Sequence, residues 1–266
     1  MSAAYVSLPH GGFRRLTRIL TRDEILRSDI VANSTMNRER GLHGVNSYTR
    51  ELGFDALAWL MSCAEAHGYA AWLDVCCGEG RALFAAAQAL GESHNHLNIH
   101  LAGVDLVAPG SHGSRFPGSS RMPPIGDQGP AKPSAVQLEF IESDIDGYMP
   151  TGAFDLITCV HGLHYLADKL GFLERAYGWL TSGGILVGHL DPANVRSDTM
   201  LRSFWPAAFR HARHEGAEVG LKSHRLRIER NACVLDFGAE YVGAGPSETV
   251  NYTGITVIDS WYRFKG

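Results

Sequence analysis

The segment that most constrains the fold spans residues 72–81 and reads WLDVCCGEGR. A short apolar run passes directly into a glycine-containing turn, and residues 82–90, rich in alanine and leucine, predict a helix after it. Glycines let the backbone approach a ligand closely, and a helix start offers unpaired N–H groups to a carboxylate or a ribose. The dinucleotide fingerprint G-x-G-x-x-G is absent, so phosphate binding of that type is not predicted.

Short apolar runs and helical patterns alternate from residue 70 onward, which predicts an α/β fold with a doubly wound, mostly parallel sheet. The expected strands are residues 71–76, 100–106, 136–142, 154–160 and 184–190. The expected helices are residues 82–90, 167–180 and 195–214. Residues 225–237 and 253–263 read as β, and we expect them to form an antiparallel C-terminal hairpin that completes a seven-stranded sheet.

The chain before residue 69 predicts an N-terminal helical extension, and residues 69–266 predict one Rossmann-like domain. Thr21 is a plausible N-cap for a helix over residues 21–31, and Asp55 and Gly68 bracket a second helix over residues 56–67. Residues 107–135 contain six prolines, five glycines and five serines, which indicates a long irregular insertion.

Composition narrows the class of partner. The formal net charge of −4 provides no bulk positive field that would draw the chain to nucleic acid or to an anionic membrane. No apolar run approaches the roughly 18–20 residues that span a bilayer, and the first residues lack the apolar stretch of a signal peptide. Five irregularly spaced cysteines fit a reducing compartment. We therefore expect a cytoplasmic protein that acts on a small molecule.

Acidic residues accompany the first three predicted strands in series, the first of them inside its strand. Asp74, Gly78 and Gly80 match the pattern acid-x-Gly-x-Gly-x-Gly, with Cys76 at the place of its first glycine. Asp105 ends the second strand and Asp144 follows the third. A fourth strand ends at residues 158–161, TCVH, and residues 180–187, LTSGGILV, give a later turn and strand. In this order, over residues 70–192, the chain resembles the class I, Rossmann-like methyltransferases that use S-adenosylmethionine.

The resemblance implies a role for each of these positions. Asp105, with its neighbour Leu106, would hold the ribose hydroxyls, while Asp144 would take the adenine amino group and Ile145 would cover the ring. Asp74 would support the glycine turn and the cofactor pocket indirectly. Residues 41–50 would form a lid over the cofactor, with Tyr48 and Arg50 as candidates for its carboxylate; a connector with one packed tyrosine is the alternative. S-adenosylhomocysteine would be the product.

Methyl transfer requires alignment of two reactants and, for many acceptors, removal of a proton. His161 at the end of the fourth strand is the candidate general base, because imidazole titrates near neutral pH. The alternative is a hydrogen-bonded histidine without a catalytic part. His164 is a second candidate, with a structural role as its alternative. The histidines at positions 94, 96, 100, 161 and 164 lack convincing carboxylate or thiolate partners, so no metal is expected.

The predicted function is methyl transfer to an O or N atom of a small molecule. Methylation of a protein or nucleic acid is an alternative, disfavoured by the charge and by the lack of an Asn/Asp-Pro-Pro-aromatic tetrapeptide. A fold that binds the cofactor but acts as a cyclase or regulator is another. The aromatic-rich face of residues 195–214 would either border the acceptor or belong to the core. The oligomeric state stays open, a homodimer being one option.

Overall fold

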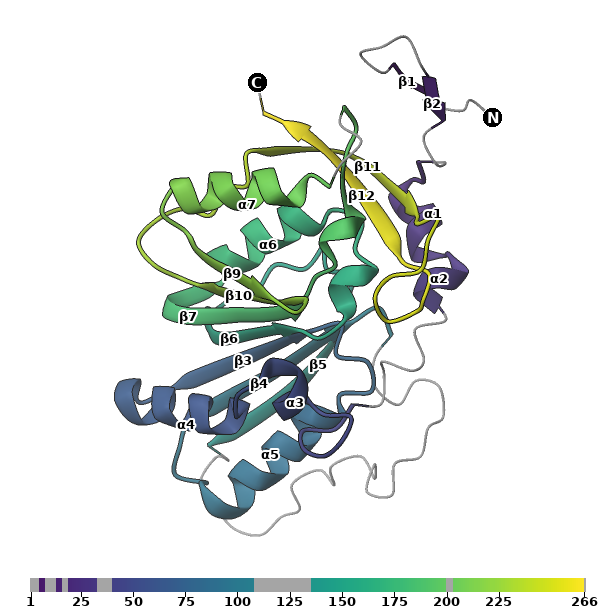
Figure 1. The fold of residues 1–266 in the computed structure, drawn as a ribbon. Coiled ribbons are helices and arrows are strands. Elements are labelled where there is room, and N and C mark those ends of the chain that lie inside the picture. The colour runs from purple at the N-terminus through teal and green to yellow at the C-terminus, as the bar shows by residue number, and fades with distance from the viewer. Residues whose placement is uncertain are drawn as a thin grey trace. The chain divides into compact units, whose positions relative to one another are not determined.

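The computed structural model describes residues 5–7, 13–15, 19–32, 40–107, 135–199 and 203–265 (Figure 1). The strands include a seven-stranded sheet of order β5-β4-β3-β6-β7-β10-β9. These strands are β3 (Ala70–Val75), β4 (Ile99–Asp105), β5 (Val136–Glu142), β6 (Phe154–Cys159), β7 (Leu180–His189), β9 (Glu218–Lys222) and β10 (Arg225–Glu229). β3 pairs in parallel with β4 and β6, whereas β10 runs antiparallel to β7 and β9. The predicted fold class is confirmed.

The chain divides into two compact units, Asn37–Val160 and Met1–Met36 with His161–Gly266. In the first unit, every residue of β3 is buried, as expected for a central parallel strand that is apolar at every position except Asp74. Helix α4 (Ala56–His67) packs on β3 and β6, and helix α5 (Arg81–Ser93) packs on β4 and β5. The Asp55 side chain caps α4 and Gly68 ends it in a left-handed conformation, so this helix is confirmed to the residue.

In the second unit, helix α6 (Lys169–Gly178) packs on β7 and helix α7 (Trp205–His214) packs on β9. β9 and β10 form a hairpin whose two turn residues, Ser223 and His224, both have positive φ angles, of 49° and 64°. Such a turn matches the right-handed twist of the paired strands. The hairpin therefore supplies the antiparallel edge of the sheet.

The predicted helix over residues 195–214 was wrong in its first half. Residues Val195–Ser197 form strand β8, which pairs in parallel with β12 (Ile258–Phe264), and α7 begins only at Trp205. Pro206 explains the late start, because a proline lacks an N–H and its ring clashes with the carbonyl four residues earlier inside a helix. In the first turn of a helix the same residue is tolerated.

The predicted C-terminal hairpin was also wrong in its partners. Residues 225–229 pair with β9 and β7, whereas β12 belongs to a separate three-stranded sheet of order β11-β12-β8, with β11 at Ala239–Pro246. β9 and β11 were not predicted from the sequence. A two-residue turn connects β9 to β10. Closing this short loop costs less chain entropy than pairing β10 with the distant strand β12.

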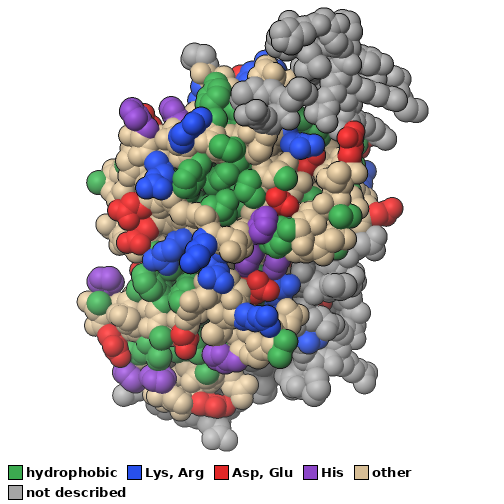
Figure 2. Space-filling model, viewed as in Figure 1, with side chains coloured by type: hydrophobic (Ala, Val, Ile, Leu, Met, Phe, Trp, Pro, Cys, Tyr) green, Lys and Arg blue, Asp and Glu red, His purple; other side chains and the backbone are tan. Residues whose placement is uncertain are grey.

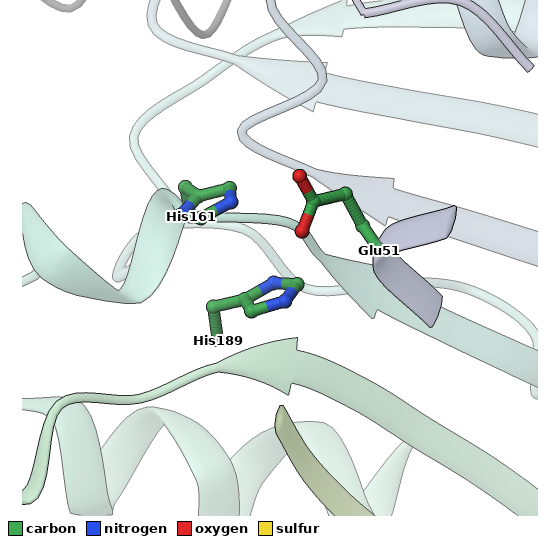
Figure 3. Close-up of side chains that lie close together, drawn as sticks. All are labelled: Glu51, His161 and His189. Carbon is green, nitrogen blue, oxygen red and sulfur yellow. The ribbon is translucent and has the colours of Figure 1, made fainter. Parts of the chain in front are cut away.

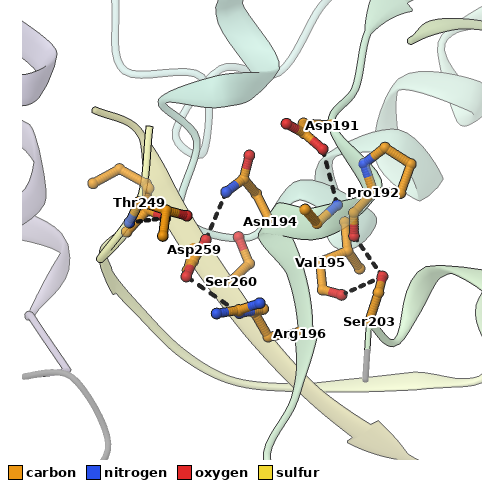
Figure 4. A network of polar contacts seen from close by, with 12 residues as sticks. Asp191, Pro192, Asn194, Val195, Arg196, Ser203, Thr249, Asp259 and Ser260 are labelled. Carbon is orange, nitrogen blue, oxygen red and sulfur yellow. Dashed lines mark hydrogen bonds and ion pairs between the residues drawn. The ribbon is translucent and has the colours of Figure 1, made fainter. Parts of the chain in front are cut away.

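A polar network fixes β8 and the short 3-10 helix η3 (Pro192–Asn194) beside β12 (Figure 4). The Asn194 amide donates to Oδ1 of Asp259 at 2.7 Å, and Nε of Arg196 lies 3.3 Å from Oδ2 of the same carboxylate. Ser203 Oγ donates to the carbonyl of Val195 at 3.0 Å. Asp259 and Asn194 are buried, so each needs the partner that it has.

The N-terminal region shows two short strands, β1 (Tyr5–Ser7) and β2 (Phe13–Arg15), that pair antiparallel. The predicted helix over residues 21–31 is divided into α1 (Arg22–Leu26) and α2 (Asp29–Ala32). Thr21 caps α1, as expected, and the structure adds a reciprocal capping box with Glu24. Ser28 Oγ donates a hydrogen bond to the carbonyl of Ile25. Such side-chain bonds compete with the backbone hydrogen bonds of a helix, and this one lies between α1 and α2.

The predicted insertion falls almost entirely on residues 108–134, which lie outside the described residues. The domain boundary at residue 68 stays a prediction. Among the described residues, no helix combines the length and apolar character needed to cross a membrane.

Candidate cofactor and acceptor sites

Gly78 and Asp105 are joined at the carboxyl ends of β3 and β4, and Asp144 follows the end of the neighbouring strand β5. The backbone N–H of Gly78 donates to Oδ2 of Asp105 at 2.9 Å. The backbone N–H of Ser143, directly before Asp144, donates to the carbonyl of Asp105 at 3.0 Å. The strand order reverses between β3 and β6, and open α/β sheets bind ligands beyond the strand ends at such a point. The glycine turn and both acids therefore share one edge of the sheet.

The turn after β3 uses left-handed backbone at three positions. Gly78 and Gly80 have φ angles of 59° and 68°, and Cys76 has a φ angle of 57°. Residues other than glycine rarely adopt this conformation. Cys76 adopts it at the position where the family pattern has glycine. Gly80 is further restricted, because an added Cβ would overlap Cε1 of the Phe140 ring.

Asp74 is buried beneath this turn and bonds two hydroxyl groups. Tyr48 Oη donates to Oδ2 at 2.6 Å, and Thr158 Oγ1 donates to Oδ1 at 2.6 Å. The indole N–H of Trp72 donates to Thr158 Oγ1 at 2.8 Å, which extends the chain. Burial raises the pKa of Asp74 to about 7, against the opposing effect of the two hydroxyl bonds. Asp74 thus joins β3 to β6 and to the helix that carries Tyr48.

The remaining cofactor candidates occupy different environments. Tyr48 is buried in α3 (Tyr48–Leu52), whereas Arg50 of the same helix is exposed and donates to the carbonyl of Val45 at 3.3 Å. Leu106 directly follows β4 and is half-buried. Ile145 is buried, and Oδ1 of Asp144 accepts from the N–H of Asp146 at 3.1 Å.

The two candidate catalytic histidines belong to the second unit and lie among other rings. His161 has a φ angle of 61°, a conformation that proteins retain mainly where the surroundings impose it. Its ring stacks on that of His189, with centroids 4.3 Å apart and planes at 2° (Figure 3). The His164 ring centroid lies 5.6 Å from that of His161 and 5.4 Å from that of Tyr252. The rings of His224 and Tyr252 stack at 3.8 Å.

We call His161, His164, His189, His224 and Tyr252 the ring cluster. The first two members were predicted from the sequence as site residues, and the other three were not. His189 ends β7, as His161 follows the end of β6. Ligands of such sheets bind at the strand ends, and this position could have identified His189 from the sequence. His224 and Tyr252 lie in a hairpin turn and in a loop that only the tertiary fold brings close.

Comparison with known proteins identifies the family. The family model described as methyltransferase domain matches residues 48–219, about two thirds of the chain, and the chain belongs to this family. The match contains β3 to β7, the glycine turn, both strand-end acids and His161. A comparison with curated proteins found no match.

Several solved structures resemble the chain weakly. The DszA carbon methyltransferase has 16% sequence identity and a TM-score of 0.44, over 79% of this chain and 60% of that one. The plantazolicin methyltransferase BpumL in complex with SAH has 15% identity and a TM-score of 0.38, over 62% and 55%. Coclaurine N-methyltransferase bound to N-methylheliamine and SAH has 17% identity and a TM-score of 0.39, over 65% and 48%. The chain spans about half the length of the first structures it matches.

Proposed function

We propose that the protein transfers a methyl group from S-adenosylmethionine to an O or N atom of a small molecule. The observation that carries the proposal is the meeting of Gly78, Asp105 and the residue before Asp144 at one sheet edge. The family match supports the same reaction class. In the transfer, the bond between the methyl carbon and the sulfonium sulfur breaks as the acceptor atom bonds that carbon, and S-adenosylhomocysteine leaves.

Asp105 is the proposed ribose ligand, with Leu106 beside it. A carboxylate accepts two hydrogen bonds from a diol, and such charge-assisted bonds are stronger than neutral ones. Asp144 is the proposed partner of the adenine amino group, and Ile145 the apolar cover of the ring. Gly78, Gly80 and Cys76 shape the turn, and Asp74 and Tyr48 support it from beneath through their mutual hydrogen bond.

The Asp105→Ala variant tests the cofactor assignment. We expect its affinity for S-adenosylmethionine to fall at least about tenfold, which corresponds to about 1.4 kcal/mol, as measured by calorimetric titration. Asp146→Ala is the matched control, because it removes an exposed acid from the loop after β5. Equal affinities of wild type and Asp105→Ala for S-adenosylmethionine would show that Asp105 does not bind the ribose.

His161 is the proposed general base for an acceptor that must lose a proton. His164, the second candidate, is the weaker base, because burial lowers its pKa to about 2. For His161→Ala we expect an unchanged cofactor affinity and a turnover about a hundredfold lower, measured with a labelled methyl donor and a pool of metabolites. Unaltered turnover would leave His161 with a structural role. Cofactor binding without turnover on any acceptor would favour a cyclase or a regulator.

A small acceptor is preferred over nucleic acid on electrostatic grounds. On the face drawn in Figure 2, acidic and basic side chains are interspersed. The net charge of −4 is also unsuited to a phosphate backbone, for which binding depends on positive charge. Methylation of added oligonucleotides that exceeds methylation of the metabolite pool would contradict this preference.

A further inference from the structure

His164 carries two buried ring nitrogens that have no hydrogen-bond partner among the described residues. The side chain is fully buried, at 0% exposure. Nδ1 of His224 is a further buried nitrogen without a partner in the part of the chain that the structure describes. Buried polar atoms without partners cost stability, so such groups in a native fold point to a partner that arrives later.

The protonation of His164 restricts what that partner is. Burial, followed by the charges that His161 and Lys169 can carry, lowers the pKa of His164 to about 2. The ring is therefore neutral near pH 7, with one nitrogen that donates and one that accepts. A hydroxyl both donates and accepts, so it suits either nitrogen, whereas a carboxylate only accepts and an ammonium only donates.

The chain itself shows which kind of ring the cluster accommodates. The Tyr252 phenol lies flat on His224, with planes at 9°, and meets His164 edge to face, with planes at 70°. These are the arrangements that aromatic rings prefer. Tyr252 is 41% exposed, so its side chain can rotate toward solvent.

The loop that carries Tyr252 is held in place independently of the ring. The backbone N–H of Tyr252 donates to Oδ2 of Asp191 at 3.4 Å, and Oδ1 of Asn251 accepts from the backbone and hydroxyl of Thr253 at 2.9 and 2.6 Å. The Gly254 N–H donates to the carbonyl of Asn251. Rotation of the Tyr252 side chain therefore needs no rearrangement of the loop backbone.

We propose that the ring cluster binds a phenol, a flat aromatic ring with a hydroxyl group, in the place that the side chain of Tyr252 occupies. The ligand stacks its ring on His224 and, because it is not attached to the backbone as Tyr252 is, turns its hydroxyl toward His164, which the Tyr252 hydroxyl does not bond. The assignment of this phenol as the methyl acceptor rests on the proposed function. The binding site itself depends only on residues of the second unit.

The first experiment uses phenol as the probe and the full chain without cofactor. Proton–carbon correlation spectra of the histidine rings are recorded during titration. We expect the His164 and His224 signals to shift in a saturable manner. Cyclohexanol, which keeps the hydroxyl without the flat ring, and toluene, which keeps the ring without the hydroxyl, are expected to bind at least about fivefold more weakly. Equal shifts with all three probes, or none with phenol, would overturn the proposal.

Variants give effects of opposite sign. Tyr252→Ala removes the occluding ring and is expected to tighten phenol binding at least about threefold, whereas Tyr252→Phe keeps the ring and the wild-type affinity. In the Tyr252→Ala background, His164→Leu is expected to weaken phenol binding at least about fivefold. The same background with His214→Leu, at an exposed histidine, is the control. Unchanged affinity in Tyr252→Ala, or retention of it after His164→Leu in a folded variant, would contradict the site.

The outcomes separate the two proposals. If S-adenosylmethionine binds but phenol does not, the cofactor assignment stands and the phenol site is wrong. If phenol binds with the expected variant effects but S-adenosylmethionine does not, the ring cluster is a ligand site and the proposed methyl transfer fails.

Discussion

Asp74 is a buried carboxylate whose pKa, about 7, lies above the value of about 3.9 expected in the unfolded chain. Between these two values the folded protein binds more protons than the unfolded one. The free energy of unfolding therefore falls as pH rises from about 4 to about 7. Above pH 7 the loss of stability caused by ionising Asp74 is complete. The folded state is most stable when Asp74 is protonated.

Asp74→Asn is expected to remove this dependence. The amide stays neutral and can still bond the hydroxyls of Tyr48 and Thr158. Each pKa unit corresponds to about 1.4 kcal/mol, so the variant should gain at least about 2 kcal/mol relative to wild type between pH 4 and pH 7. Urea unfolding across this range measures the difference. Parallel pH profiles for the two proteins would show that Asp74 is ionised in the folded state.

Single residues also show where prediction from sequence worked. The positions of Asp105 and Asp144 were predictable, because acids at the ends of successive apolar runs reach the same sheet edge by the geometry of parallel strands. The Tyr48–Asp74 bond was not predictable, because a tyrosine 26 residues away has no sequence spacing that directs its hydroxyl to one carboxylate.

At the scale of elements, the glycine turn before α5 depends on Gly80. Gly80→Ala places a Cβ at a φ angle of 68° and against the ring of Phe140. We expect a loss of about 2–4 kcal/mol in the free energy of unfolding, from left-handed strain and overpacking together. Chemical denaturation measures it.

Gly91→Ala in α5 is the matched control. Its added Cβ meets nothing within 4 Å, and alanine favours a helix interior over glycine by up to about 1 kcal/mol. A neutral or stabilising effect is expected there. Similar losses at both positions would mean that the turn places no special demand on residue 80.

Elements differed in how well the sequence predicted them. Helix α4 has a side-chain cap, apolar spacing and a terminal glycine, all local signals that agree. β8 has only three residues, and its extended conformation depends on pairing with β12, more than 60 residues later. A local pattern cannot contain that information, so residues 195–197 were assigned to the wrong structure.

At the scale of the whole molecule, a ligand that binds only the folded state stabilises it by mass action. S-adenosylhomocysteine at about 100 times its Kd should add about 2.7 kcal/mol, which corresponds to a rise of about 5–10 °C in Tm. Differential scanning calorimetry measures the rise, and Asp105→Ala should reduce it at the same ligand concentration. A wild-type Tm that is independent of ligand would argue against the cofactor proposal.

The sequence by itself determined the α/β class, most of the central strands, the glycine turn and the strand-end acids. Each of these follows from short-range periodicity or from the fixed direction of parallel strands. Only the tertiary structure decided the partners of β8, β10 and β12, the hydroxyl bonds of Asp74 and the assembly of the ring cluster. These features join side chains and strands from distant parts of the chain, and their energies come from burial and pairing that no local pattern encodes.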